Sequence, residues 1–170
     1  MIKEIVTWPN KSLIKKTSDV SFDEDLSIVE DLIDTLVDCG ALGISAPQIG
    51  SSKRICVIYD KKLAEIDKRS SESEFVVLIN PQIVDGMGDL VFQEGCNSVP
   101  GHTAIVPRAM MSIVRYTNID GKQIEACFSG MTSAVVQHEI DHLDGVTIAD
   151  RQNAQERAVM VQSLDLLSNS

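Results

Sequence analysis

The sequence predicts an α+β fold in which antiparallel strands surround a central helix, with one further helix toward each end of the chain. Three segments carry apolar residues at helical spacing, at residues 23–39, 129–143 and 150–170. Runs rich in β-branched residues lie between the first two segments, as is typical of short strands. The chain has 170 residues and no internal repeat, which favours a single domain over residues 1–170 with a C-terminal helical tail at residues 150–170.

The first helix is predicted over Asp23–Cys39. Acidic residues occupy its first turn, where they complement the positive end of the helix dipole, and Gly40 follows its last turn. This spacing indicates an amphipathic helix with one face against a core. Its apolar stripe consists of Leu26, Val29, Leu32, Ile33, Leu36 and Val37.

The strands are predicted over residues 54–59, 75–79, 111–116 and 123–128, which are short runs rich in β-branched side chains. Between the last two runs, the sequence Asn-Ile-Asp-Gly at residues 118–121 has the composition of a tight hairpin turn. The polar, serine-rich residues 67–74 indicate an exposed loop.

The central helix is predicted over Ser129–Leu143. Its buried stripe contains His138 and His142, which continue the apolar positions Met131 and Val135. The tail helix has a weaker stripe, and we interpret it as packing either on the chain's own core or against a second copy. That stripe consists of Ala154, Met160, Leu164 and Leu167.

The central helix carries an HExxH motif, HEIDH at residues 138–142. Two histidines four residues apart project from one face of a helix and can bind one metal ion. Cys96 supplies a third ligand as thiolate and leaves one position open, as catalytic sites require. Glu139 lies beside the ligands, where a carboxylate can take a proton from the attacking water and return it to a leaving group.

HExxH also occurs by chance on surface helices. Two features argue against that reading. The two histidines lie on an apolar stripe, and the chain has only three histidines, of which two fall in the motif.

Three motifs together resemble those of the peptide deformylase family: GISAPQIG at residues 43–50, EGCNS at 94–98 and HEIDH at 138–142. The resemblance extends from the N-terminal stretch to about residue 150. It implies a metal-dependent hydrolase that removes the formyl group from N-formylmethionyl peptides of nascent proteins and releases formate. It also implies one divalent metal ion, Fe2+ in the cell, while the thiolate and imidazole donors would equally accept Zn2+, Ni2+ or Co2+.

The resemblance also assigns roles. Gln48 and the backbone N–H of Asn97 are expected to polarise the formyl oxygen, although the residues alone leave Gln48 as a solvent-facing loop residue. Substrate contacts are expected along an apolar pocket, and ordinary core packing is the alternative for each pocket residue, because a pocket wall and a core have the same composition. The candidates are Leu42, Gly43, Phe92, Glu94, Gly95, Met131, Ala134 and Val135.

Two further polar residues have open roles. His102 is either an additional ligand or proton carrier, or a solvated loop residue. Asp141 either orients an imidazole or a neighbouring arginine such as Arg108, or faces solvent.

The chain departs from the family at four positions, of which Ala41 for a glycine and Ser45 for an alanine are minor small-for-small changes. The other two lie near the site. Asn97 stands where leucine is usual, and Thr103 where many bacterial members have arginine, so contacts with the peptide are expected to differ. A deformylase-like module that binds metal and peptide without turnover is therefore an alternative function. HExxH alone is also typical of metalloproteases, but these take their third ligand downstream, whereas Cys96 lies upstream.

The overall charge limits the partners. A net charge of −10 and a pI near 4.6 argue against a nucleic-acid surface, which needs clustered cations. No apolar run approaches the roughly 18 residues of a membrane span. Deformylase tails can dock transiently on the ribosome through basic residues, but Arg151 and Arg157 are the only cations of this tail.

The cysteines indicate a reducing compartment. The chain has four of them and an adequate apolar fraction for a core without disulfides. We therefore expect a cytoplasmic protein in which Cys39, Cys56 and Cys127 are buried thiols.

Overall fold

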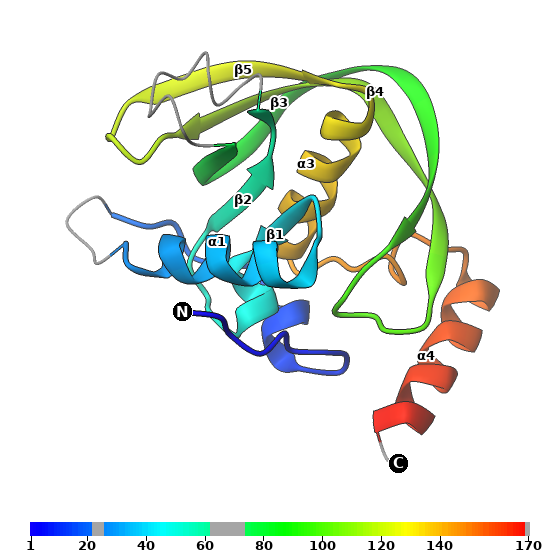
Figure 1. Ribbon diagram of the computed structural model, residues 1–170. Helices are drawn as coiled ribbons and strands as arrows, with labels where there is room; N and C mark the ends of the chain where they lie inside the picture. The colour runs from blue at the N-terminus through cyan, green and yellow to red at the C-terminus, as the bar shows by residue number, and fades with distance from the viewer. Residues whose placement is uncertain (22–25, 62–73, 169–170) are drawn as a thin grey trace.

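A computed structural model describes residues 1–21, 26–61 and 74–168. Its strands form one antiparallel sheet in the order β1-β2-β3-β4-β5, which curves around α3 (Figure 1). The class is therefore α+β, as predicted. The strands are β1 (Gly43–Ser45), β2 (Ile55–Tyr59), β3 (Phe75–Gly95), β4 (Thr103–Thr117) and β5 (Gln123–Ser129). The helices are α1 (Ile28–Cys39), α3 (Gly130–Leu143) and α4 (Ala154–Ser168), with short 3₁₀ turns η1 (Lys11–Ile14) and η2 (Ala46–Ile49).

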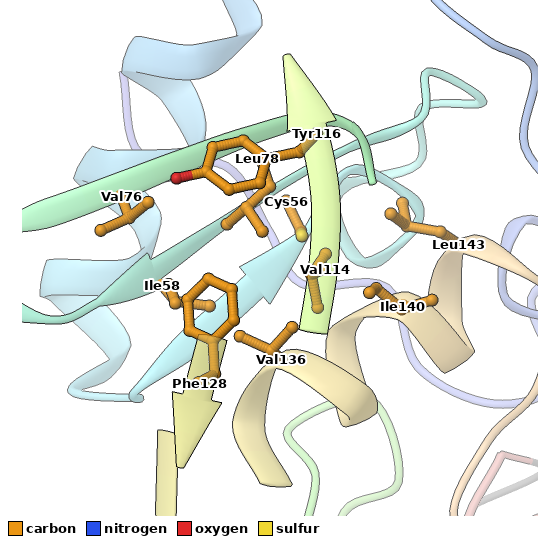
Figure 2. Packing of buried hydrophobic residues seen from close by; sticks show 10 residues of the cluster. All are labelled: Cys56, Ile58, Val76, Leu78, Val114, Tyr116, Phe128, Val136, Ile140 and Leu143. Carbon is orange, nitrogen blue, oxygen red and sulfur yellow. The ribbon is translucent and has the colours of Figure 1, made fainter. Parts of the chain in front are cut away.

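Alternate residues of β2 and β3 pack on the two faces of the sheet, because successive side chains of a strand point in opposite directions. One set packs against α3, and Figure 2 shows this cluster. The other set packs against α1. The first cluster includes Cys56, Ile58, Val76, Leu78, Val136, Ile140 and Leu143. The second includes Ile55, Val57, Val77, Ile79, Val29, Leu32 and Leu36. Since α3 contacts all five strands, its position is fixed by the sheet.

The tail helix α4 packs on the chain itself. Met160 and Leu164 are buried in a third apolar cluster with Val99, Val106 and Ile148. This is the first of the two arrangements expected for the tail. The helix begins at Ala154 rather than near residue 150, because the side chain of Asn153 accepts hydrogen bonds from the backbone N–H groups of residues 155 and 156 as an N-cap. The predicted stripe residues Ala154 and Leu167 are exposed.

The predicted first helix was too long at its start. Helix α1 begins at Ile28, and residues 22–25 lie outside the described part of the chain. It ends as expected, with Gly40 in the left-handed region (φ 63°) donating its N–H to the carbonyl of Val37. The side chain of Val37, predicted on the apolar face, is 61% exposed. The buried face of α1 is therefore narrower than the apolar stripe predicted from the sequence.

The predicted strands match β2, β5 and the second half of β4 closely. The prediction was wrong for residues 80–95 and 103–110, where β3 and β4 continue as a long antiparallel pair, and it did not include β1. Proline and glycine interrupt this arm at Pro81, Gly86, Gly88 and Pro107, and such residues normally indicate turns. The arm accommodates irregularity through two register shifts, between residues 79 and 82 and between 83 and 85. Of the loop predicted over residues 67–74, residues 67–73 lie outside the described residues.

The four cysteines are free thiols, but only Cys56 is fully buried. Cys39 is half-buried and Cys127 is exposed, so the expectation of buried thiols is confirmed for Cys56 alone and is wrong for Cys39 and Cys127. On β5, the neighbouring Phe128 points into the α3 cluster, so Cys127 points to the opposite, solvent-facing side. None of the described helices is both long and apolar enough to cross a lipid bilayer.

Candidate metal centre

The structure brings together the three residues predicted as metal ligands. Cys96 directly follows β3, and His138 and His142 lie one turn apart on α3. One ligand atom from each residue lies within 4.8 Å of the other two. His142 Nε2 is 3.2 Å from Cys96 Sγ and 3.2 Å from His138 Nε2. A thiolate and two imidazoles converging in this way fit a divalent transition-metal ion.

The electrostatics of the cluster favour the ligating form of cysteine. Burial alone would raise the pKa of Cys96, but His142 and His138 outweigh it and hold that pKa well below its ordinary value. For His138 the effect of burial is the opposite, since it would lower the pKa, but hydrogen bonds with Cys96 and Glu94 raise that pKa well above its ordinary value. The thiolate, not the thiol, binds metals.

The two histidines are held differently. His138 Nδ1 lies 2.9 Å from a carboxylate oxygen of Glu94, and this contact turns Nε2 toward Cys96 and His142. For His142 Nδ1, which is buried, the described residues provide no hydrogen-bond partner. Metal-binding histidines are usually oriented by a hydrogen bond from the second ring nitrogen to an acceptor. The protein therefore fixes the ring of His138 more firmly than that of His142.

Glu94 is itself held by Arg108. Nε and an Nη of Arg108 donate to the two carboxylate oxygens at 2.7 and 2.8 Å. Burial would raise the pKa of Glu94, but Arg108 and His138 outweigh it and lower the pKa to about 2. Arg108 also donates to Asp141 at 2.6 Å, so of the alternatives left open for Asp141, the structure shows the contact with Arg108.

Glu139 lies beside the ligands without belonging to their cluster. Its residue is 3% exposed, and burial raises the pKa of its carboxyl group. The backbone of β1 passes close to it, because a Cβ atom added to Gly43 would lie only 2.8 Å from Glu139 Oε1. A buried carboxylate at this position can exchange protons with a reacting group in the adjoining cavity.

Gln48 is buried, at 4% exposure, in η2. Its Oε1 accepts hydrogen bonds from the backbone N–H of Ser45 at 2.8 Å and from the Ser45 hydroxyl at 3.0 Å. These bonds direct the amide N–H group toward the ligands, with Nε2 3.7 Å from Cys96 Sγ. The alternative of a solvent-facing loop residue is therefore wrong for Gln48.

A cavity of about 580 Å³ adjoins the ligand cluster. Its walls come from the segment before and within β1, the end of β3, the following loop and α3. Of the residues predicted from the sequence, those that line it are Leu42, Gly43, Gln48, Phe92, Glu94, Gly95, Cys96, Asn97, Met131, Ala134, Val135, His138 and Glu139. His142 is the one predicted site residue outside the lining, since it is buried beneath Cys96 and His138.

The exposures of the lining residues distinguish a wall from a core. Met131 and Leu42 are 55% and 47% exposed, so both face the cavity or solvent. Met131 was expected to be buried, but it lies in the first turn of α3 with its side chain on the cavity. Glu94 lines the cavity while its carboxylate is held by Arg108 and His138. His102 lines the mouth, with Nδ1 2.9 Å from the carbonyl of Pro100, and lies outside the ligand cluster.

The sequence interpretation missed several lining residues. These are Ala41, Gln93, Val99, Pro100 and Gly101. Ala41 precedes the candidate Leu42 and the other four flank or follow EGCNS, and this proximity in sequence is the only signal that could have identified them. The Gln93 amide donates to the hydroxyl of Thr103 at 3.1 Å, so the end of β3 and the start of β4 are linked at the mouth.

Comparison with known proteins is consistent with this geometry. The polypeptide deformylase family matches residues 2–158. A peptide deformylase of Desulforudis audaxviator is 40% identical over 151 residues, covering 87% of this chain and 92% of the relative. The crystal structure of a peptide deformylase from Legionella pneumophila is similar with a TM-score of 0.84 and 34% identity, covering 99% and 96% of the two chains. A peptide deformylase from Ehrlichia chaffeensis, in complex with actinonin, has a TM-score of 0.86 at 28% identity and covers 99% of each chain.

Proposed function

Because the chain belongs to the polypeptide deformylase family, we propose that it hydrolyses the formamide of N-formylmethionyl peptides and releases formate. The convergence of Cys96, His138 and His142 beside a cavity supports this most directly. Nascent polypeptides are the proposed substrates, and the cytoplasm is the compartment that such substrates imply.

Cys96, His138 and His142 would hold a single divalent ion, for which we propose Fe2+. Bound there, such an ion supplies Lewis acidity that activates water and polarises a carbonyl oxygen. The donor set alone does not choose between iron, zinc, nickel and cobalt. The choice of iron follows from family resemblance.

Glu139 is the proposed proton carrier. It is adjacent in sequence to His138, but its carboxylate lies outside the ligand cluster and within the cavity lining. It would accept a proton from the attacking water and deliver it to the departing amine nitrogen, so that each turnover leaves the carboxylate as it began. The buried surroundings keep bulk water from competing for that proton.

Gln48 and the backbone N–H of Asn97 are the proposed donors to the oxygen that gains negative charge during the reaction. Ser45 holds Oε1 of Gln48 with two hydrogen bonds, so the amide is oriented before the substrate binds. Donors fixed in advance stabilise a developing oxyanion without the cost of reorganisation. For Asn97, only the backbone is assigned a role, so its side chain need not be leucine.

The apolar part of the cavity would take the methionine side chain. Leu42, Phe92, Met131 and Val135 line it beside the ligands, and apolar lining with few polar groups is typical of small-ligand sites. We do not extend the proposal to ribosome contact through the tail, because Arg151 and Arg157 are already paired with Asp141 and Asp150.

The test is formate release by iron-loaded protein under anaerobic conditions. Formyl-Met-Ala-Ser should give formate, whereas acetyl-Met-Ala-Ser and a peptide cleavable only at internal amides should give no product. Glu139→Ala should abolish formate release while still retaining the metal. Absence of formate from metal-loaded wild-type protein would instead favour a binding module that has lost turnover, consistent with the changes at Asn97 and Thr103.

A further inference from the structure

A series of five side chains, in which basic and acidic groups alternate, runs from the candidate metal centre to the protein surface. His138 contacts Glu94 at 2.9 Å, and Glu94 contacts both Nε and an Nη of Arg108. Arg108 donates its other Nη to Asp141 at 2.6 Å. Asp141 in turn receives two hydrogen bonds from Arg151, one of them from Nε at 2.9 Å.

The inner members of this series are shielded from water and the outer end is not. The side chains of Arg108, Glu94 and Asp141 are 3%, 9% and 12% exposed, whereas that of Arg151 is 44% exposed. Ion pairs between exposed groups contribute little. The inner pairs are different, because a buried charge that loses its partner is strongly destabilised.

The backbone next to Arg151 is held in place by contacts of the preceding residue. The preceding residue, Asp150, accepts hydrogen bonds from the backbone and hydroxyl of Thr147 at 2.9 and 2.8 Å. Asp150 also pairs with Arg157 on α4. The segment between α3 and α4 is therefore held at both sides, and its arginine presents a rigid fork to Asp141.

We propose that Arg151 is a positioning residue for the metal centre, acting on His138 through Asp141, Arg108 and Glu94. The proposal rests on the assignment of His138 as a metal ligand. With both oxygens of Asp141 held by Arg151, Asp141 fixes Arg108, and Arg108 holds Glu94 against His138 Nδ1. Without Arg151, Asp141 can turn toward solvent. The contacts through Arg108 and Glu94 then no longer fix the orientation of the His138 imidazole.

This arrangement makes the C-terminal segment part of the metal site without direct contact with the metal. Partners one step beyond the ligands typically change metal affinity by about 10- to 100-fold when removed. Arg151 lies further away, so the expected effect is at the lower end, about 10-fold. Lysine is not an adequate replacement, because it cannot make two parallel N–H···O contacts with one carboxylate.

The experiment measures the Zn2+ dissociation constant of the whole protein by competition with a chelator. Arg151→Gln should raise this constant about 10-fold, and Arg151→Lys should raise it less. The matched control is Arg115→Gln, which breaks an exposed ion pair with Glu125 on β4 and β5 and should leave the constant unchanged. Unfolding temperatures of the metal-free variants are measured in parallel.

A lower unfolding temperature for Arg151→Gln with wild-type zinc affinity would overturn the proposal and leave Arg151 a purely structural role. If Arg151→Gln does not fold, Arg151→Lys decides, since an unchanged zinc affinity in that variant would equally overturn it. The measurement needs no substrate. It therefore tests Arg151 even if formyl-Met-Ala-Ser is not a substrate.

Discussion

The buried floor of the cavity and its mouth differ in how their side chains are held. At the floor, Glu139 and Gln48 are at most 4% exposed, with His142 buried beneath it, and Gln48 is fixed by two hydrogen bonds from Ser45. At the mouth, Asn97 is exposed, and Met131 is 55% exposed. Floor residues are constrained by burial and partners, whereas mouth residues are free to change with the substrate.

The same contrast applies to the two larger departures from the family, whereas the small-for-small change at Ser45 is buried beside Gln48. The ligands and Glu139 match the motifs, and all lie at or beneath the floor. Asn97 and Thr103, which differ, lie at the exposed mouth or beside it. We therefore expect the floor positions to determine the chemistry and the mouth positions to determine which peptides are accepted.

The largest expected effect comes from the proton carrier at the floor. Glu139→Gln keeps the size of the side chain and removes its ability to accept a proton, so kcat should fall about 100- to 10,000-fold. Metal content, measured by elemental analysis, should stay at the wild-type value because Glu139 is outside the ligand cluster. Loss of metal in parallel with activity would show that Glu139 acts on the ligands instead.

A second floor position tests packing. Gly43→Ala would place a Cβ 2.8 Å from both Glu139 Oε1 and Val135 Cγ1, so β1 or α3 must move, at a cost of about 1–3 kcal/mol in the free energy of unfolding. Gly95→Ala at the mouth is the control, since its nearest neighbour would be 4.0 Å away. Urea unfolding measures both, and equal stability of the two variants would contradict the close fit at Gly43.

The charge on Glu94 gives a pH-dependent contribution to stability. Its pKa falls from 4.5 to about 2 in the folded protein, so the folded state is stabilised above pH 4.5, and this contribution is lost as the pH falls from 4.5 toward 2. Glu94→Gln should therefore flatten the fall in unfolding free energy of the metal-free protein over this range. Glu125→Gln, which breaks an exposed ion pair, should retain the wild-type change of unfolding free energy with pH. If Glu94→Gln retains it too, groups other than Glu94 are responsible for that change.

The floor was also the part that could be predicted from the sequence. Two histidines one helical turn apart share a face in any α-helix, so local spacing alone placed His138 and His142 together. Cys96 was assigned as the third ligand from its donor chemistry and Gln48 by motif resemblance, and the structure brings Cys96 to His142 and Gln48 to Cys96. Local patterns also located α1, α3 and most strands, because their apolar residues follow the period of a helix or strand.

What the sequence could not provide depends on contacts between distant segments. The β3–β4 arm contains prolines and glycines that indicate turns, and only pairing across the two strands keeps it extended. The contacts among Glu94, Arg108, Asp141 and Arg151 join β3, β4, α3 and the segment after it. No spacing rule relates such positions. Asp141 was accordingly left between a structural and a solvated role.

The smallest expected effect tests the mouth directly. Asn97→Leu restores the residue usual in the family, and the exposed side chain is not assigned to the reaction, since only the backbone N–H of Asn97 is. KM for formyl-Met-Ala-Ser should therefore change by a few-fold at most, because one altered apolar or polar contact is worth about 1 kcal/mol, while kcat should stay within about two-fold of wild type. Steady-state kinetics on the iron-loaded protein measures both. A large change in kcat would mean that the Asn97 side chain reaches the reacting group, and the division between floor and mouth would then fail at this residue.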